Sequence, residues 1–143
     1  MRFYSALAIV LVVLFAHSAF AQRLAISVSV ANIRSGPGTK YPILWSGEKN
    51  FPIVVLEKKG SWYRFKDFEG DQGWIHSSIV ARDQTVITQK NRCIIRKGPG
   101  PKFDVLFIVE KGVPFEVIGT KGRWFNVRHA DGDTGWIYST LVW

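Results

Sequence analysis

Three side chains of the chain after residue 21 could perform covalent chemistry: the thiol of Cys93 and the imidazoles of His76 and His129. A thiol hydrolase needs a cysteine activated by a nearby histidine. The segment around Cys93 is predicted to be a strand, whereas thiol pKa values are lowered at helix N-termini. Gly-x-Ser-x-Gly, which would mark a serine nucleophile, is absent from the sequence. We therefore expect Cys93 to be a small buried side chain and predict no catalytic residue.

A second possible centre is His129-Ala-Asp131-Gly-Asp133, where carboxylate and carbonyl oxygens could bind a hard cation. The same spacing occurs 62 residues earlier as Asp67-Phe-Glu69-Gly-Asp71. What the two segments share is an acidic residue, Gly and Asp, which is typical of a hairpin turn. We predict turns here, with no metal site and no cofactor.

Aromatic residues recur at the same 62-residue interval and offer binding chemistry. Within Trp62 to Phe65, period two predicts that Tyr63 and Phe65 point inward while Trp62 and Arg64 point outward. Most of the recurring rings must serve packing in so small a unit, but outward-facing aromatics could stack on a sugar or hold a peptide. The predicted ligand surface lies between a Gly-Pro-Gly loop and the strand that follows, and comprises Lys40, Tyr41, Trp62, Arg64, Lys102, Phe103 and Trp124.

The sequence segments that position these residues occur twice in the chain. Residues 32–80 align with residues 94–142 without a gap. The shared features include Gly-Pro-Gly at 36–38 and 98–100, and Gly-Trp-Ile at 73–75 and 135–137. Self-similarity of this length indicates two structural units, and two copies are too few for an open solenoid.

Each copy is predicted to be a meander of short strands. In the first copy, period-two apolar residues predict one strand over 25–34, and short apolar segments predict further strands at 43–45, 53–56, 62–65 and 73–75. None has the ten to twelve residues that a helix usually needs. We predict an all-β fold of two tandem small barrels, five to six strands each, with the first at residues 22–82 and the second at 83–143.

The order Asn-Ile-Arg-x-Gly-Pro-Gly, Gly-x-Trp and Gly-Trp-Ile resembles the bacterial Src homology 3 (SH3-like) domain in tandem, over about 25–82 and 87–143. The resemblance implies a non-catalytic module of extracytoplasmic bacterial proteins that binds cell-wall peptides, glycans or proteins, commonly beside a hydrolase domain. The second copy departs from the pattern at Ile94, which replaces Asn32, and it has only Leu141-Val142-Trp143 where its last strand would begin. We expect this shortened end to leave an open edge, which residues 84–92 or the other copy complete.

The N-terminus has the features of a removable leader. Arg2 supplies a positive start, residues 6–16 are uncharged and apolar, and Ala19-Phe-Ala21 offers small residues for cleavage after Ala21. The apolar run is shorter than the roughly 20 residues that span a bilayer, which disfavours the alternative of an uncleaved anchor. We predict a signal peptide at 1–21, a periplasmic or secreted protein, and no stable membrane insertion after cleavage.

Charge is spread evenly over the remainder of the chain. Residues 22–81 hold eight basic and five acidic side chains, and residues 82–143 hold ten and six. Because the basic residues form no run, we predict no nucleic-acid binding. The predicted function is recognition of a cell-envelope ligand, either a peptidoglycan peptide or a glycan. One alternative is an adaptor that binds another envelope protein by strand addition; a Cys-dependent wall hydrolase ranks last.

Overall fold

A computed structural model describes residues 21–143 of the chain, and the predicted leader lies almost wholly outside them, in residues 1–20. The described residues form strands and two short 3₁₀ helices, which confirms the all-β prediction. Within this part of the chain no helix has the length and apolarity needed to cross a membrane.

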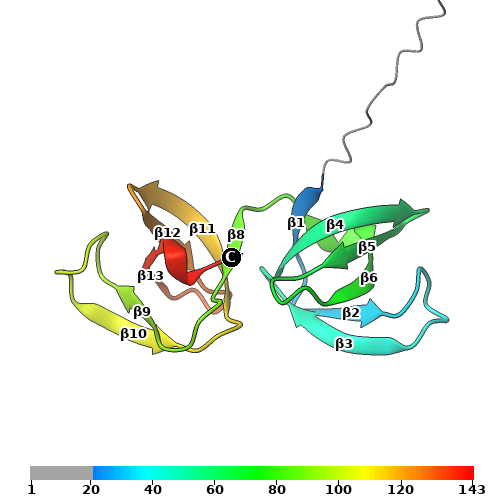
Figure 1. The fold of residues 1–143 in the computed structure, drawn as a ribbon, viewed down its shortest axis with the longest axis horizontal. Helices are drawn as coiled ribbons and strands as arrows, with labels where there is room; N and C mark the ends of the chain where they lie inside the picture. Colours follow the sequence, from blue (N-terminus) through cyan, green and yellow to red (C-terminus); the bar gives the residue numbers. More distant parts are fainter. Residues whose placement is uncertain (1–20) are drawn as a thin grey trace, which may run out of the picture.

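The strands form two separate sheets, one from each sequence repeat (Figure 1). The first sheet has the order β3-β2-β6-β5-β4-β1-β7, and the second has the order β10-β9-β13-β12-β11-β8. The first contains β1 (Gln22–Ile26), β2 (Val30–Arg34), β3 (Ile43–Glu48), β4 (Pro52–Lys59), β5 (Trp62–Lys66), β6 (Gln72–His76), the 3₁₀ helix η1 (Ser77–Ile79) and β7 (Val80–Ala81). The second contains β8 (Thr85–Ile87), β9 (Cys93–Arg96), β10 (Val105–Val109), β11 (Pro114–Lys121), β12 (Trp124–Arg128), β13 (Thr134–Tyr138) and the 3₁₀ helix η2 (Ser139–Leu141).

The predicted single strand over 25–34 is wrong, because the chain breaks after Ile26 into β1 and β2. Ile26 is buried in the core, but Val30, four residues later, is 69% exposed. The amide of Ser27 donates to the carbonyl of Ile79, which turns the chain out of the β1 direction. As a result β1 pairs with β4 and β7, while β2 pairs with β3 and β6. The alternation also changes phase at this break, because Ala31 and Ile33 are the buried residues of β2 while Val30 faces solvent, and a continuous period-two pattern could not show that two different ladders share the segment.

The second barrel closes in the same way as the first. Residues 84–92 do contribute to it, as expected, through β8, which pairs with β11, but the predicted open edge at its last strand is wrong. In the first barrel β7 pairs with β1 through Val80 and Ile26. At the equivalent place Val142 bridges Thr88, and Trp143 exchanges two backbone hydrogen bonds with Ile87. Two residues therefore suffice to cover the edge of β8. The first barrel counts seven strands and the second six because Val80–Ala81 forms a two-residue strand, whereas Val142 forms an isolated bridge.

Each barrel has its own hydrophobic core. Phe65 and Ile53 are fully buried in the first, and the equivalent positions in the second hold Val127 and Phe115. The phenylalanine of each pair thus sits on β5 in the first core and on β11 in the second. Val55 pairs with Phe65, and Val117 with Val127, which makes positions 53 and 65, like 115 and 127, diagonal neighbours on adjacent strands. The exchange keeps a bulky side chain at one site of each pair and a branched aliphatic one at the other.

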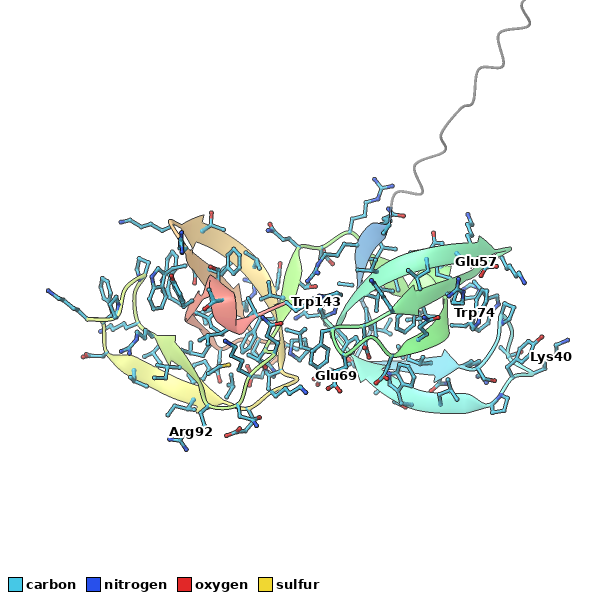
Figure 2. All side chains as sticks on the ribbon, in the orientation of Figure 1. Lys40, Glu57, Glu69, Trp74, Arg92 and Trp143 are labelled. Atoms are coloured by element: carbon cyan, nitrogen blue, oxygen red, sulfur yellow. The ribbon has the colours of Figure 1, made fainter. Side chains whose placement is uncertain are left out.

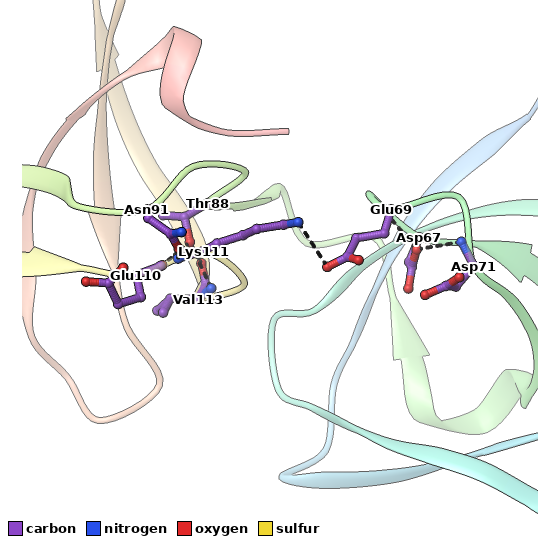
Figure 3. A network of polar contacts seen from close by, with 8 residues as sticks. All are labelled: Asp67, Glu69, Asp71, Thr88, Asn91, Glu110, Lys111 and Val113. Carbon is purple, nitrogen blue, oxygen red and sulfur yellow. Dashed lines mark hydrogen bonds and ion pairs between the residues drawn. The ribbon is translucent and has the colours of Figure 1, made fainter.

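The barrels contact each other through two polar links. Arg23 of β1 donates from Nη2 to the carbonyls of Thr85 (3.1 Å) and Trp143 (2.9 Å), and its guanidinium lies 4.3 Å from the centre of the Trp143 ring. Lys111, before β11, forms an ion pair of 3.5 Å with Glu69 in the β5–β6 turn (Figure 3). In this arrangement the β2–β3 loop and the β9–β10 loop lie at opposite ends of the molecule (Figure 1).

Candidate functional site

Each barrel carries a surface groove, and the two grooves are lined by equivalent residues. The groove of the first barrel has a volume of about 220 Å³, and that of the second about 540 Å³. Every lining residue of the first is matched, 62 positions later, by a lining residue of the second. The first set is Val30, Asn32, Arg34, Thr39, Trp62, His76 and Ile79; the second is Arg92, Ile94, Arg96, Pro101, Trp124, Tyr138 and Leu141.

The wall of each groove is an aromatic pair fixed by strand register. Trp62 and His76 face each other on β5 and β6, and their rings meet edge to face at 5.2 Å. Trp124 and Tyr138 face each other on β12 and β13, with centroids 5.3 Å apart and planes tilted by 54°. Directly opposed residues on antiparallel strands bring their side chains together, so the backbone ladder sets this wall. The 3₁₀ helices then add Ile79 and Leu141.

The opposite side of each groove is a loop held in place by an arginine. Arg34 Nη1 donates to the carbonyls of Thr39 (3.1 Å) and Tyr41 (3.0 Å), and Arg96 Nη1 donates to the carbonyl of Phe103 (2.9 Å). Tyr41 packs flat against the loop backbone, where a Cβ on Gly36 would approach its ring to 2.5 Å. Glycine is required there by this close approach, which explains the first glycine of the Gly-Pro-Gly motif through packing.

The structure brings only two of the seven predicted site residues into the grooves, Trp62 and Trp124. Tyr41 and Phe103 cover the loop backbone next to Gly36 and Gly98, and the Lys40 ammonium lies 5.4 Å from the Tyr41 ring centre, at one end of the molecule (Figure 2). Lys102 is exposed on the equivalent loop. Arg64 lies outside the groove lining.

Arg64 belongs to a different surface. Its Nε donates to Glu57 (2.8 Å) and its Nη1 to Gln72 (2.8 Å). The ion pair keeps the pKa of the exposed Glu57 carboxyl below its ordinary value, mainly through the hydrogen bond from Arg64. The second barrel has Asn126 and Gly119 at the positions of Arg64 and Glu57, so this ion pair is not repeated.

Sequence reasoning missed most of the lining residues, although the repeat contained the signal for two positions. Arg34 and Arg96 are identical in the two copies, and His76 and Tyr138 both follow Gly-Trp-Ile. Ile75 is fully buried, so period two places His76 on the outer face with Trp62. Ile79 and Leu141 could not be found in this way, because a 3₁₀ turn after the strand decides their direction.

Cys93 is a buried core residue, as predicted. Its side chain is 0% exposed and its Sγ donates to the carbonyl of Lys90 at 3.0 Å. Burial raises the pKa of the Cys93 thiol above its ordinary value. A thiol held protonated and away from solvent is poorly suited to nucleophilic attack.

The two acidic segments form turns. Asp67 Oδ1 accepts hydrogen bonds from the amides of Glu69 and Asp71, both at 2.9 Å, while burial raises the pKa of its carboxyl (Figure 3). In the second barrel Asp131 accepts from the amide of Asp133 and pairs with His129 at 3.0 Å, which together hold its pKa low. Among residues 21–143 no group of three His, Cys, Asp or Glu side chains is arranged to hold a metal ion.

The sequence model of the family described as Bacterial SH3 domain matches residues 27–81 and 89–143. The chain belongs to the Bacterial SH3 domain family. The two matched regions correspond to the two sheets, so each barrel is one bacterial SH3 domain.

Curated relatives of these bacterial SH3 domains are named as amidases. A Bacillus subtilis protein named as an N-acetylmuramoyl-L-alanine amidase, YrvJ, is 26% identical over 128 residues, which cover 82% of this chain and 24% of the relative. A Staphylococcus epidermidis protein named as a cell wall amidase, LytH, is 36% identical over 61 residues, covering 42% of this chain and 21% of the relative. The chain thus spans about a quarter or less of the relatives it matches.

The solved structures that the chain matches include an NlpC/P60 family protein from Bacillus cereus and NlpC2 from Trichomonas vaginalis. The first has 15% identity and a TM-score of 0.41, and covers 85% of this chain and 56% of its own. The second has 7% identity and a TM-score of 0.36, and covers 87% of this chain and 49% of its own.

Proposed function

We propose that the protein is an exported, non-catalytic binding protein of the bacterial cell envelope whose two SH3 domains each hold a wall ligand, a peptidoglycan peptide or glycan, in the groove beside Trp62 or Trp124. The leader is residues 1–21 and the binding units are residues 22–82 and 83–143. The observation that carries the proposal is the pair of equivalent grooves, in which a tryptophan and an arginine recur although neither Trp62 nor Trp124 belongs to a hydrophobic core.

The grooves have the composition of recognition sites. Each combines an aromatic wall, an aliphatic side chain from the 3₁₀ helix and one arginine that is already fixed by the loop. Aromatic-lined grooves bind extended peptides, and aromatic faces stack on apolar ligand surfaces. The wall-amidase names of the relatives support the envelope as the place where the ligand occurs.

Two copies of the groove affect how the protein would bind a polymer. The loops that border the grooves point to opposite ends of the molecule, and the barrels are linked by Arg23 and Lys111. Two sites on one polymeric ligand raise the apparent affinity through effective concentration if both can be reached together. Loss of one groove is therefore expected to weaken binding and loss of both to abolish it.

The test is co-sedimentation of the purified protein with peptidoglycan sacculi. We expect the wild type to pellet, Trp62→Ala or Trp124→Ala to pellet less, and the double variant to remain in the supernatant. Replacing a stacking aromatic costs about 1–3 kcal/mol per site, or roughly five- to 150-fold in affinity.

The matched control is Tyr41→Phe with Phe103→Tyr, which alters the loop aromatics outside the grooves. This control is expected to pellet like the wild type. Absence of wild-type pelleting at low salt, or unimpaired pelleting of a folded double tryptophan variant, would refute the proposal.

A second candidate function, an adaptor for another envelope protein, is favoured by one observation. β10 is an edge strand, and Val105, Leu106 and Ile108 on it are each close to half exposed. Exposed apolar edges accept an added strand from a partner. The test is a pull-down from solubilised envelope proteins with the wild type and Leu106→Lys. A stoichiometric partner that the lysine variant loses would support the adaptor role, and its absence would count against it.

A further inference from the structure

The two grooves are built alike but differ in charge. At the rim where the first has Val30, the second has Arg92, and both retain an arginine at the end of the following strand, Arg34 or Arg96. The second groove is therefore flanked by two guanidinium groups and the first by one. Its floor is also more apolar, because Ile94 and Pro101 replace Asn32 and Thr39.

The guanidinium groups of the second groove retain free donors. The Arg92 side chain forms no hydrogen bond or ion pair with any residue in 21–143, and it projects outward from the second barrel (Figure 2). Arg96 uses Nη1 for the Phe103 carbonyl at 2.9 Å, and its Nε and Nη2 make no hydrogen bond within the same residues. Arg34 in the first groove likewise uses only Nη1, for two carbonyls, so the grooves differ by the additional guanidinium of Arg92. Two arginines without a carboxylate partner beside an apolar floor are complementary to an anion that carries an apolar portion.

We infer that the second groove is the site for an extended peptide that carries a carboxylate, with the carboxylate bound between Arg92 and Arg96 and an apolar side chain seated against Trp124, Ile94 and Leu141. The inference rests on the proposed function, since it names the ligand class of one of its two grooves. A peptide fits better than a sugar because the floor is aliphatic and the Trp124 and Tyr138 rings are tilted by 54°, so they form no flat platform. Aromatic-lined grooves of this kind seat successive side chains of an extended chain.

The experiment titrates the purified protein with two synthetic peptides and follows the indole N–H signals of Trp62 and Trp124 by NMR. One peptide is acetyl-Ala-Pro-Leu-Ala-Glu with a free C-terminus, and the other is its Gln analogue with an amidated C-terminus. We expect the acidic peptide to shift the Trp124 signal at concentrations about tenfold lower than the amide, with the Trp62 signal shifting less. The signals are assigned from Trp62→Phe and Trp124→Phe.

Variants test the arginine contribution directly. Arg92 has a positive φ of 56°, so Arg92→Asn removes the charge with a residue that tolerates this backbone conformation. Arg92→Asn is expected to lose most of the preference for the acidic peptide, and Arg92→Lys to keep part of it. Arg82→Gln, which removes one positive charge outside the groove, is the matched control and should behave like the wild type.

Several outcomes overturn the inference. Equal responses to the two peptides, an unaltered preference in Arg92→Asn, or equal shifts of both indoles each do so. A Trp124 shift with N-acetylmuramic acid but with neither peptide would overturn the peptide assignment in favour of an anionic sugar. In all these cases sacculus pelleting that depends on Trp62 and Trp124 would leave the proposed function standing, so the two failures are distinguishable.

Discussion

At the scale of single residues, the environment of a side chain decides what its chemistry can contribute. Asp67 and Asp131 both cap hairpin turns, yet the pKa of Asp67 is raised by burial while the pKa of Asp131 is lowered by the amide of Asp133 and by His129. The acidic turns look alike in the sequence. The tertiary environment separates the two cases: the Asp67 carboxyl is buried, whereas Asp131 is exposed and pairs with His129, the residue equivalent to Asp67.

This contrast predicts opposite pH dependences. A raised folded-state pKa means that the Asp67 contribution to stability is full below the unfolded pKa of about 4 and is lost as the pH rises through the folded value. Asp67→Asn keeps an oxygen acceptor for the two amides and should therefore remove this decline. The stability of the variant relative to the wild type should be higher at pH 7 than at pH 3.5. The measurement is the free energy of unfolding in urea across that range.

Asp131→Asn provides the comparison. Because its folded pKa is lowered, the stability contributed by Asp131 is present above the unfolded pKa and is lost as the pH falls. The stability of Asp131→Asn relative to the wild type should therefore be lower at pH 7 than at pH 3.5. The same direction of change in both variants would contradict the assignment of these two pKa shifts.

At the scale of strands, the two cores place the same kinds of side chain, one aromatic and one branched aliphatic, on neighbouring strands in opposite order. Ile53 and Phe65 in the first core correspond to Phe115 and Val127 in the second. Aligning the repeats reveals the exchange of sizes, but the strand register shows that the exchanged positions are diagonal neighbours. A change at one position is therefore expected to be compensated at the other.

We expect Phe65→Val to destabilise the protein by about 2 kcal/mol, because it leaves a cavity in a closed core. Ile53→Phe alone should cost about 1–3 kcal/mol through overpacking. The double variant should be more stable than the sum of the two single effects predicts, as measured by a double-mutant cycle in urea.

Phe115→Ile with Val127→Phe is the reciprocal pair in the second barrel and should show coupling of the same sign. Strict additivity in both barrels would show that the positions do not share one space.

At the scale of the whole molecule, Arg23 holds the barrels together. It reaches from β1 to the carbonyls of Thr85 and Trp143, and desolvation in this position lowers its pKa from the ordinary value. The ion pair of Lys111 with Glu69 is close to half exposed on both sides, and such pairs contribute about 0–1 kcal/mol. Arg23 is therefore expected to contribute more to the fixed arrangement.

Arg23→Gln should leave both barrels folded but let them reorient independently. The expected result is a shorter and unequal rotational correlation time for the two barrels in ¹⁵N relaxation measurements, with the chemical shifts of both cores retained. Lys111→Gln removes the exposed ion pair and the contact of the ammonium with the Phe68 ring, 5.9 Å from its centre, and should leave the correlation times nearly unchanged. Joint tumbling of the two barrels in Arg23→Gln would show that other contacts maintain the arrangement.

What the sequence determined by itself is what repeats or alternates along it: the duplication, the short strands, the tight turns, the outward direction of Trp62 and the buried state of Cys93. These features depend on backbone periodicity and local turn chemistry, which neighbouring residues decide. The tertiary structure decided the break between β1 and β2, the closure of the second barrel by Val142 and Trp143, the full lining of the grooves and the Arg23 link. Each of these joins residues that are distant along the chain, such as Arg23 and Trp143, and no local pattern records which distant groups meet when the barrels close.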